Sequence, residues 1–248
     1  MTTILDITNI SFRTKTKTLV HNFSLSIHQG EIHGLLGPNG AGKTTTFHLI
    51  AGLLNTHSGK IKLYGNDITH LDLSGRCSLG LGFMAQERTL FPEMTVKDNI
   101  FCALELNQTS IQQQNTLYEK ILQQLQIKPI ENTRASALSG GEARRTELAR
   151  ILAKEPKVLL MDEPFAGVDP KATSDIKALI HYLSKLGISI LLTDHNAREI
   201  LTLCDRITII KDGTTLITGT KKEVISSESA NLAYLNGQFD DLLLPMGS

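Results

Sequence analysis

One stretch decides the fold of this chain: Gly37-Pro38-Asn39-Gly40-Ala41-Gly42-Lys43-Thr44-Thr45. It fits the pattern G-x-x-x-x-G-K-[ST], in which a glycine-rich loop joins a strand to a helix and binds phosphate. The apolar residues 32–36 predict the strand before the loop, and the residues after it predict the helix. The alternative, a glycine-rich turn without a ligand, leaves the Lys-Thr ending without a reason.

The chemistry expected of this loop is anion binding. Its glycines let backbone N–H groups turn toward phosphate oxygens, and the helix that follows presents the positive end of its dipole. Lys43 adds a charge near the β- and γ-phosphates, and the Thr44 hydroxyl can coordinate Mg²⁺. The sequence therefore predicts an α/β fold with a nucleotide and Mg²⁺ at this loop.

Composition limits the other possibilities. The chain has 248 residues, enough for a large core, and its 25 basic residues equal its 25 acidic residues. A net charge of zero argues against a nucleic-acid binder that depends on phosphate neutralisation. No apolar run reaches the roughly 18 residues that a membrane-spanning helix needs. We therefore expect any membrane role to depend on a partner protein.

A second apolar strand is predicted from residue 158, and it ends in Asp162 and Glu163. Carboxylates at the carboxyl end of a parallel strand lie where ligands bind in α/β sheets. Asp162 can hold Mg²⁺ directly or through water, and Glu163 can polarise an attacking water molecule. An acidic pair at a strand end is also common for structural reasons, but the phosphate-binding loop upstream favours a functional pair.

Two further polar residues follow predicted strands. Gln86 comes after residues 81–84, where it could reach Mg²⁺ or the attacking water. His195 comes after residues 188–193, where it could donate a hydrogen bond to the γ-phosphate. Taken alone, each is more often an ordinary loop residue.

A second helix start has similar chemistry. Ser139 and Glu142 form the S-x-x-E pattern of a capping box, and a helix is predicted to run to about residue 154. Gly140 and Gly141 occupy its first turn, where glycine is unfavourable, so we expect a function for the bare backbone. Free N–H groups at a helix start bind anions, which predicts a second phosphate contact.

Asp169 and Phe12 each have two interpretations. Asp169 before Pro170 predicts the N-cap of a helix over residues 171–186, which explains both residues without a ligand. Phe12 closes a predicted strand over residues 4–12. Its ring could stack on a purine, but a core position is more frequent for an aromatic side chain in a strand.

Before the second helix start, the chain becomes polar and periodic. Residues 95–106 and 111–127 predict two helices, the second introduced by a capping box from Ser110 to Gln113. We interpret this segment, residues 95–133, as a helical subdomain inserted into the main fold.

Together and in this order, these motifs resemble those of ABC-type ATPases over nearly the whole chain. The pentapeptide Leu138-Ser139-Gly140-Gly141-Glu142 is the most specific, because phosphate-binding loops occur in many families. The resemblance implies that Phe12 stacks on adenine, although tyrosine is usual there, and that Glu163, His195 and Gln86 are catalytic. The nucleotide-binding residues that it implies are Phe12, Gly37, Pro38, Asn39, Gly40, Ala41, Gly42, Lys43, Thr44, Thr45, Ser139, Gly140, Gly141 and Asp169. The metal-binding residues that it implies are Thr44, Gln86 and Asp162.

The architecture implied by this family is a P-loop NTPase core with an antiparallel β subdomain and an inserted α-helical subdomain. Residues 1–94 and 134–235 would form the ATP-binding core, residues 95–133 the helical subdomain and residues 236–248 a tail. Two copies would join head to tail around two ATP molecules, with Ser139 of one copy closing over the nucleotide of the other.

A narrower resemblance concerns transport. The stretch Phe165-Ala166-Gly167-Val168-Asp169-Pro170 and residues 234–239 are similar to the ATPase subunits of lipopolysaccharide export systems. This resemblance implies integral membrane permeases as partners and a peripheral location at the cytoplasmic face of the inner membrane. The alternative is an ATPase of a branched-chain amino acid importer, which usually has Ala-Gly-Leu-Asn-Pro at this place.

Overall fold

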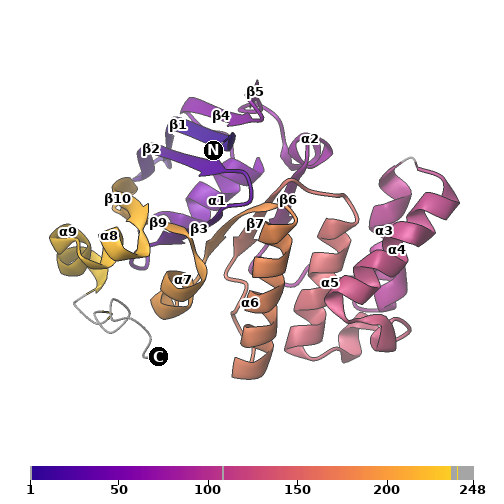
Figure 1. Ribbon diagram of the computed structural model, residues 1–248. Coiled ribbons are helices and arrows are strands. Elements are labelled where there is room, and N and C mark those ends of the chain that lie inside the picture. The colour runs from indigo at the N-terminus through magenta and orange to yellow at the C-terminus, as the bar shows by residue number, and fades with distance from the viewer. Residues whose placement is uncertain (1, 108, 236–238, 240–248) are drawn as a thin grey trace.

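The computed structural model describes residues 2–107, 109–235 and 239, and two sheets form its framework (Figure 1). The strands are β1 (Thr3–Arg13), β2 (Thr18–His28), β3 (Ile32–Leu36), β4 (Ser58–Leu63), β5 (Asn66–Asp67), β6 (Leu81–Met84), β7 (Val158–Asp162), β8 (Ser189–Thr193), β9 (Arg206–Lys211) and β10 (Thr214–Thr220). A four-stranded sheet has the order β2-β1-β4-β5, and a six-stranded sheet has the order β10-β9-β3-β8-β7-β6. The α/β class and the antiparallel β subdomain predicted from the sequence are both present.

The helices surround these sheets. The α-helices are α1 (Lys43–Ala51), α2 (Leu73–Ser78), α3 (Val96–Leu104), α4 (Ile111–Leu125), α5 (Gly140–Leu152), α6 (Pro170–Lys185), α7 (Ala197–Leu203), α8 (Lys221–Ile225) and α9 (Glu228–Ala230). The short 3₁₀ turns are η1 (Glu105–Asn107), η2 (Lys128–Ile130) and η3 (Ala135–Ala137), and a π-helical turn, η4 (Asn231–Leu235), follows α9.

The six-stranded sheet is parallel except at β10, which pairs antiparallel with β9. Every residue of β3, β7 and β8 is buried, as their continuous apolar sequences predict for parallel strands covered on both faces. Because parallel strands share one direction, the residues that follow β3, β6, β7 and β8 all emerge at the same edge of the sheet.

Two apolar clusters cover the two faces of this sheet. Alternate residues of β7 enter different clusters: Leu159 and Met161 join one, and Val158 and Leu160 join the other. The first cluster also contains side chains of α3, α4, α5 and α6, and the second contains those of α1 and the four-stranded sheet. The phosphate-binding loop therefore begins from a strand fixed on both sides.

The carboxyl end of α1 is held by an arginine that the sequence did not single out. Arg76 of α2 is buried and donates to the carbonyls of Leu49 and Ile50 at 2.6 and 2.7 Å, and to those of Thr69 and Leu71 at 2.9 Å. Burial lowers the pKa of Arg76 to about 10. Its guanidinium satisfies carbonyls at a helix end, where a positive charge is also favoured by the helix dipole.

The helical segment lies on the far side of the molecule from the four-stranded sheet (Figure 1). The Ser110 capping box at α4 is present as predicted. The two connections to this segment run side by side, because Val96 N donates to Thr133 O at 3.0 Å and Ala135 N donates to Met94 O at 2.9 Å. No helix within the described ranges has the length and apolar character needed to cross a bilayer.

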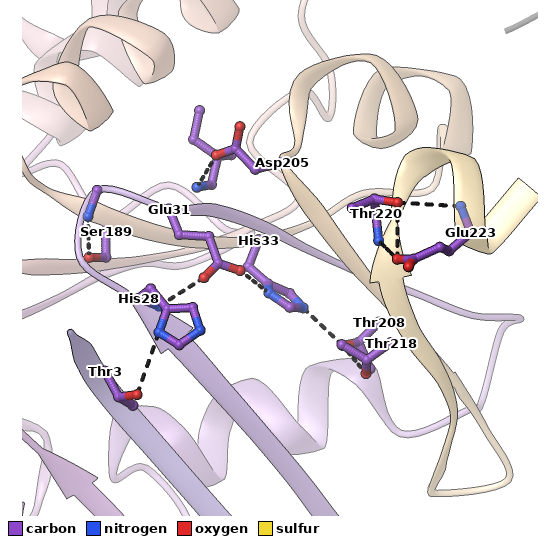
Figure 2. A network of polar contacts seen from close by, with 12 residues as sticks. Thr3, His28, Glu31, His33, Ser189, Asp205, Thr208, Thr218, Thr220 and Glu223 are labelled. Carbon is purple, nitrogen blue, oxygen red and sulfur yellow. Dashed lines mark hydrogen bonds and ion pairs between the residues drawn. The ribbon is translucent and has the colours of Figure 1, made fainter. Parts of the chain in front are cut away.

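A buried polar network fixes β3 to β9 and β10 (Figure 2). His33 of β3 is fully buried, with Nδ1 2.7 Å from Oε1 of Glu31 and Nε2 2.8 Å from the hydroxyl of Thr208. Thr208 in turn lies 2.8 Å from the hydroxyl of Thr218, and Glu31 accepts the His28 N–H at 2.8 Å. Each polar atom of His33 thus has a partner, as burial in a sheet requires.

Candidate active site

The phosphate-binding loop joins β3 to α1 and needs its glycines for two different reasons. At Gly42 the backbone φ of 103° lies in the left-handed region, where side chains are strained, and an added Cβ would lie 2.5 Å from the carbonyl of Leu19. At Gly37 an added Cβ would lie 2.1 Å from the carbonyl of Ile210. The loop is thus pressed against β2 and β9.

The start of α1 is left free of side-chain caps. Among the α-helices of the described chain, α1 is the one whose first N–H groups receive no side-chain hydrogen bond, since its N-cap is Gly42. Uncapped N–H groups and the positive end of the dipole favour an anion. The described geometry therefore fits the predicted phosphate contact.

Lys43 lies inside this loop. Its Nζ donates to the carbonyls of Gly37 at 2.7 Å and Pro38 at 3.1 Å, and the residue is 8% exposed. Burial lowers the pKa of Lys43, and the negative charges of Glu163 and Asp162 oppose that shift. The two threonines that follow Lys43 differ in exposure: Thr44 is exposed and Thr45 is half-buried.

Three of the predicted catalytic side chains meet at one carboxylate. Glu163 Oε2 accepts a hydrogen bond of 2.7 Å from Nε2 of Gln86, and Oε1 lies 2.7 Å from Nε2 of His195. The Glu163 side chain is 6% exposed, and that of His195 is 59% exposed. Glu163 also has a φ of 51°, an uncommon conformation for a residue with a side chain and one that recurs at functional sites.

Asp162 is the residue that fits a metal ion. Its Oδ1 is buried and has no hydrogen-bond partner among the described residues, which is costly unless another group binds there. Burial, together with the neighbouring Glu163 charge, raises the pKa of Asp162 to about 6, while Lys43 lowers it. Carboxylate, hydroxyl and phosphate oxygens are ligands that Mg²⁺ prefers, so the chemistry of Asp162 and Thr44 fits Mg²⁺.

Close packing explains the two glycines at the start of α5, and the sequence alone did not show this. The predicted capping box is present, with Ser139 Oγ 2.6 Å from Oε2 of Glu142. A Cβ on Gly141 would lie 2.8 Å from Cβ of Ala172, and one on Gly140 would lie 3.0 Å from the carbonyl of Gly167. Close approach to α6 and the loop before it therefore requires glycine, whether or not phosphate binds there.

Asp169 has the structural role predicted for it. Its Oδ1 accepts the N–H groups of Lys171 and Ala172, both at 3.0 Å, and Pro170 is the first residue of α6. The cap uses one of its carboxylate oxygens.

The structure places Phe12 partly in the core, and its stacking on a purine stays a prediction. The ring is half-buried against the apolar cluster of the four-stranded sheet, and it contacts the ring of His57 at a centroid distance of 5.2 Å. It also lines a pocket of about 190 Å³ together with Thr18 and His21. Phe12 is therefore neither fully buried in the core nor fully exposed to solvent.

A residue near the carboxyl end was missed. A pocket of about 510 Å³ at the phosphate-binding loop is lined by Gly37, Pro38, Asn39, His195 and Tyr234. Tyr234 belongs to η4, and burial together with the charge of Asp194 raises its pKa. The sequence offered one signal, since Tyr234 begins the stretch over residues 234–239 that resembles transport ATPases, but it gave no sign of contact with the loop. Phe239 packs against the main apolar cluster, and the rest of the predicted tail lies outside the described residues.

Comparison with known proteins decides the family. Residues 20–166 match the model of the ABC transporter family. The chain belongs to this family. As an ABC protein it binds nucleotide and hydrolyses ATP.

Similar proteins cover nearly all of this ABC protein. It is 42% identical over 95% of its length to the lipopolysaccharide export system ATP-binding protein of Haemophilus influenzae, of which it covers 98%. It is 39% identical over 93% of its length to the protein of the same description from Escherichia coli, of which it covers 96%. Among solved structures, the ADP conformation of an ATP-binding cassette of an ABC transporter has a TM-score of 0.86 at 26% identity, covering 95% of this chain and 99% of that one.

The predicted site residues of this ABC protein fall into separate groups. One group lies at the edge of the six-stranded sheet where four parallel strands end, and it consists of Lys43, Gln86, Asp162, Glu163 and His195. Phe12 and Ser139 belong to other elements, β1 and the start of α5, and neither is among the described residues that line the pocket at the loop.

Proposed function

We propose that this chain is the ATPase subunit of a transporter that extracts lipopolysaccharide from the inner membrane and exports it. The observation that carries the proposal is the match to export ATP-binding proteins of two organisms at 42% and 39% identity, over at least 93% of both chains. The same match makes a branched-chain amino acid importer the less favoured alternative.

The site supports a specific division of roles. The phosphates of ATP would bind the uncapped start of α1 and the loop, with Lys43 moving its hydrogen bonds from loop carbonyls to phosphate oxygens. Glu163 would polarise the attacking water, and Gln86 and His195 would orient the Glu163 carboxylate. Phe12 would contact the base.

The groups that would hold Mg²⁺, together with the phosphates, are the Asp162 carboxylate, the Thr44 hydroxyl and the side-chain amide oxygen of Gln86. When bound, Mg²⁺ would offset the negative charge that develops during phosphoryl transfer.

The pentapeptide over residues 138–142 would contact a second nucleotide. Ser139 is exposed at the start of α5, on an element separate from the loop pocket. Two copies in head-to-tail order would place Ser139, Gly140, Gly141 and Asp169 of one chain against ATP on the other. Such a homodimer would complete two sites at once.

The partners of this dimer would be integral membrane permeases of the lipopolysaccharide export type. The chain would sit at the cytoplasmic face of the inner membrane as a peripheral subunit. Residues 1–94 and 134–235 would form the ATP-binding core, and residues 95–133 would form the helical subdomain that transmits movement to the permeases.

Purification from the native membrane tests the proposal. The Glu163→Gln variant with ATP should hold the closed complex, and mass spectrometry should identify lipopolysaccharide export permeases as the co-purifying membrane proteins. Amino acid permeases in their place would leave the ATPase roles intact and overturn the substrate. Absence of any membrane protein would contradict the transporter assignment.

A further inference from the structure

One face of α5 is bonded along its length to the segment that carries Gln86. Arg144, Glu147 and Arg150 are spaced three residues apart, so their side chains lie on the same side of the helix. All three contact residues 85–91, between β6 and α3. We propose that Arg144 is a positioning residue that sets Gln86, and through it Glu163, for ATP hydrolysis; this rests on the proposed roles of Gln86 and Glu163.

Arg144 contacts both residues of the Gln86–Glu163 hydrogen bond. Its Nη2 donates to the main-chain carbonyl of Gln86 at 2.7 Å and reaches that of Glu163 at 3.5 Å, while Nη1 donates to the carbonyl of Ala85 at 3.1 Å. One guanidinium thus contacts the backbones of the two residues whose side chains bond each other at 2.7 Å. Because the guanidinium is planar and rigid, its hydrogen bonds fix directions as well as distances.

The arginine is itself held by Glu147. Arg144 Nη1 lies 3.0 Å from Oε2 of Glu147, and the two side chains are 6% and 2% exposed. The other carboxylate oxygen of Glu147 accepts the Thr89 N–H at 2.6 Å. A buried pair with its hydrogen bonds satisfied restricts conformation more than it adds net stability, which suits a positioning role.

Arg150 adds the last contacts in the attachment of α5 to residues 85–91. Its Nη1 donates to the carbonyl of Thr89 at 2.6 Å, and its guanidinium lies over the ring of Phe91 at 4.9 Å from the centroid. Both main-chain polar groups of Thr89 are therefore bonded to α5. Since α5 begins directly after Ser139, a shift of this helix when Ser139 meets a nucleotide would move Gln86 with it.

A purely structural pair makes a different prediction. If the Arg144–Glu147 pair only stabilises the fold, its loss lowers the melting temperature and leaves kcat unchanged in the folded protein. A positioning residue instead lowers kcat at constant ATP affinity, and its effect depends on the presence of the Gln86 side chain.

The test measures kcat, the Kd for ATP and the melting temperature of the full-length chain. Lysine at position 144 keeps the charge but cannot bond two carbonyls as a planar fork does. Arg144→Lys should lower kcat about tenfold, since small misplacements of reacting groups have effects of this size or larger. The Kd for ATP should stay within about twofold. Arg134→Lys, an exposed replacement of the same kind outside the attachment, serves as the matched control and should leave kcat unchanged.

A double-mutant cycle separates the outcomes. In the Gln86→Ala background, Arg144→Lys should change kcat by less than about twofold, because the group that it positions is gone. A full tenfold loss in that background, or normal kcat for Arg144→Lys alone, would overturn the positioning role only. Normal kcat for Gln86→Ala would overturn the proposed role of Gln86 as well. If Arg144→Lys does not fold, Glu147→Gln keeps an acceptor for Thr89 while removing the charge that holds Arg144, and it should show the same dependence on Gln86.

Discussion

The amide of Gln86 donates a hydrogen bond of 2.7 Å to Oε2 of Glu163, across 77 positions of sequence. The register of the sheet explains the meeting: Met84 of β6 pairs with Met161 of β7, and each partner of the bond lies two residues further along. The positive φ of Glu163 then sets the direction in which its side chain leaves β7. The geometry of the site is thus a consequence of strand pairing.

Replacing Glu163 by glutamine tests its proposed role as the base. The amide has nearly the same shape but accepts a proton poorly, so ATP binding should persist while turnover falls by roughly 10²–10⁴. Steady-state hydrolysis and equilibrium binding of ATP measure the two effects. Glu228→Gln, at the exposed start of α9, is the control. Near-normal hydrolysis by Glu163→Gln would sink the assignment.

Two serines with the same capping geometry separate helix stability from dimer formation. Ser139→Ala and Ser110→Ala each remove a capping box, at a cost of about 1 kcal/mol of stability. Only Ser139→Ala should weaken ATP-dependent dimerisation, measured by light scattering in the Glu163→Gln background. Equal dimerisation of the two serine variants would contradict the shared nucleotide site.

The glycine at position 141 tests packing directly. Alanine normally stabilises a helix relative to glycine by about 0.5–1 kcal/mol. Here Gly141→Ala should destabilise the protein, because its Cβ would lie 2.8 Å from that of Ala172. Adding Ala172→Gly should be less harmful than the sum of the two single changes, as measured by urea unfolding. A stabilising Gly141→Ala would show that the contact is not restrictive.

Arg76 should be among the residues on which the fold depends most. Arg76→Met removes the guanidinium that donates to four backbone carbonyls, which should lower the free energy of unfolding by about 3 kcal/mol or more. Arg134→Met removes an arginine whose ion pair with Glu93 is exposed, and it should change stability by less than about 0.5 kcal/mol. Comparable losses for both would refute the role given to the buried guanidinium.

The Glu31–His33 pair should make stability depend on acid pH. Burial alone would raise the pKa of Glu31, but hydrogen bonds from His33 and the His28 N–H hold it below the ordinary value of 4.5. A lowered pKa in the folded state stabilises the protein above 4.5, and this contribution disappears as the pH falls through the folded-state pKa. Glu31→Gln should therefore flatten the acid limb of the stability profile. Glu119→Gln, in an exposed pair with Lys128, should not.

Local signals predicted the parts of the site that lie within one element. The bounds of β3 and β6 agree with their apolar runs, because both strands lie between turn residues and are buried except for the half-buried Phe83. Parallel strands ending at one edge also made it reasonable to expect Glu163 near the loop. Its two hydrogen bonds, to Gln86 and His195, depend on side-chain directions that no sequence pattern gives.

What sequence could not supply depends on distant contacts. Helix α2 has six residues, including a glycine, and shows no useful periodicity, so Arg76 had no visible context. The sequence suggested only that Gly141 exposes its backbone to a ligand. It could not predict the packing contact with Ala172, because Ala172 belongs to another helix. Tyr234 reaches the loop pocket from the end of the described chain, where the local sequence says nothing of the loop.

Because its two connections are paired, we propose that the helical segment, residues 95–133, is an exchangeable module. The chain leaves and re-enters at adjacent points, and hydrogen bonds between Met94 and Ala135 and between Val96 and Thr133 join these points directly. Segments of other lengths could therefore be grafted there without shifting any strand of either sheet, provided that their inner surface matches α5. A lineage that needed a new membrane partner could change this module without changing the residues around Glu163 at the edge of the six-stranded sheet.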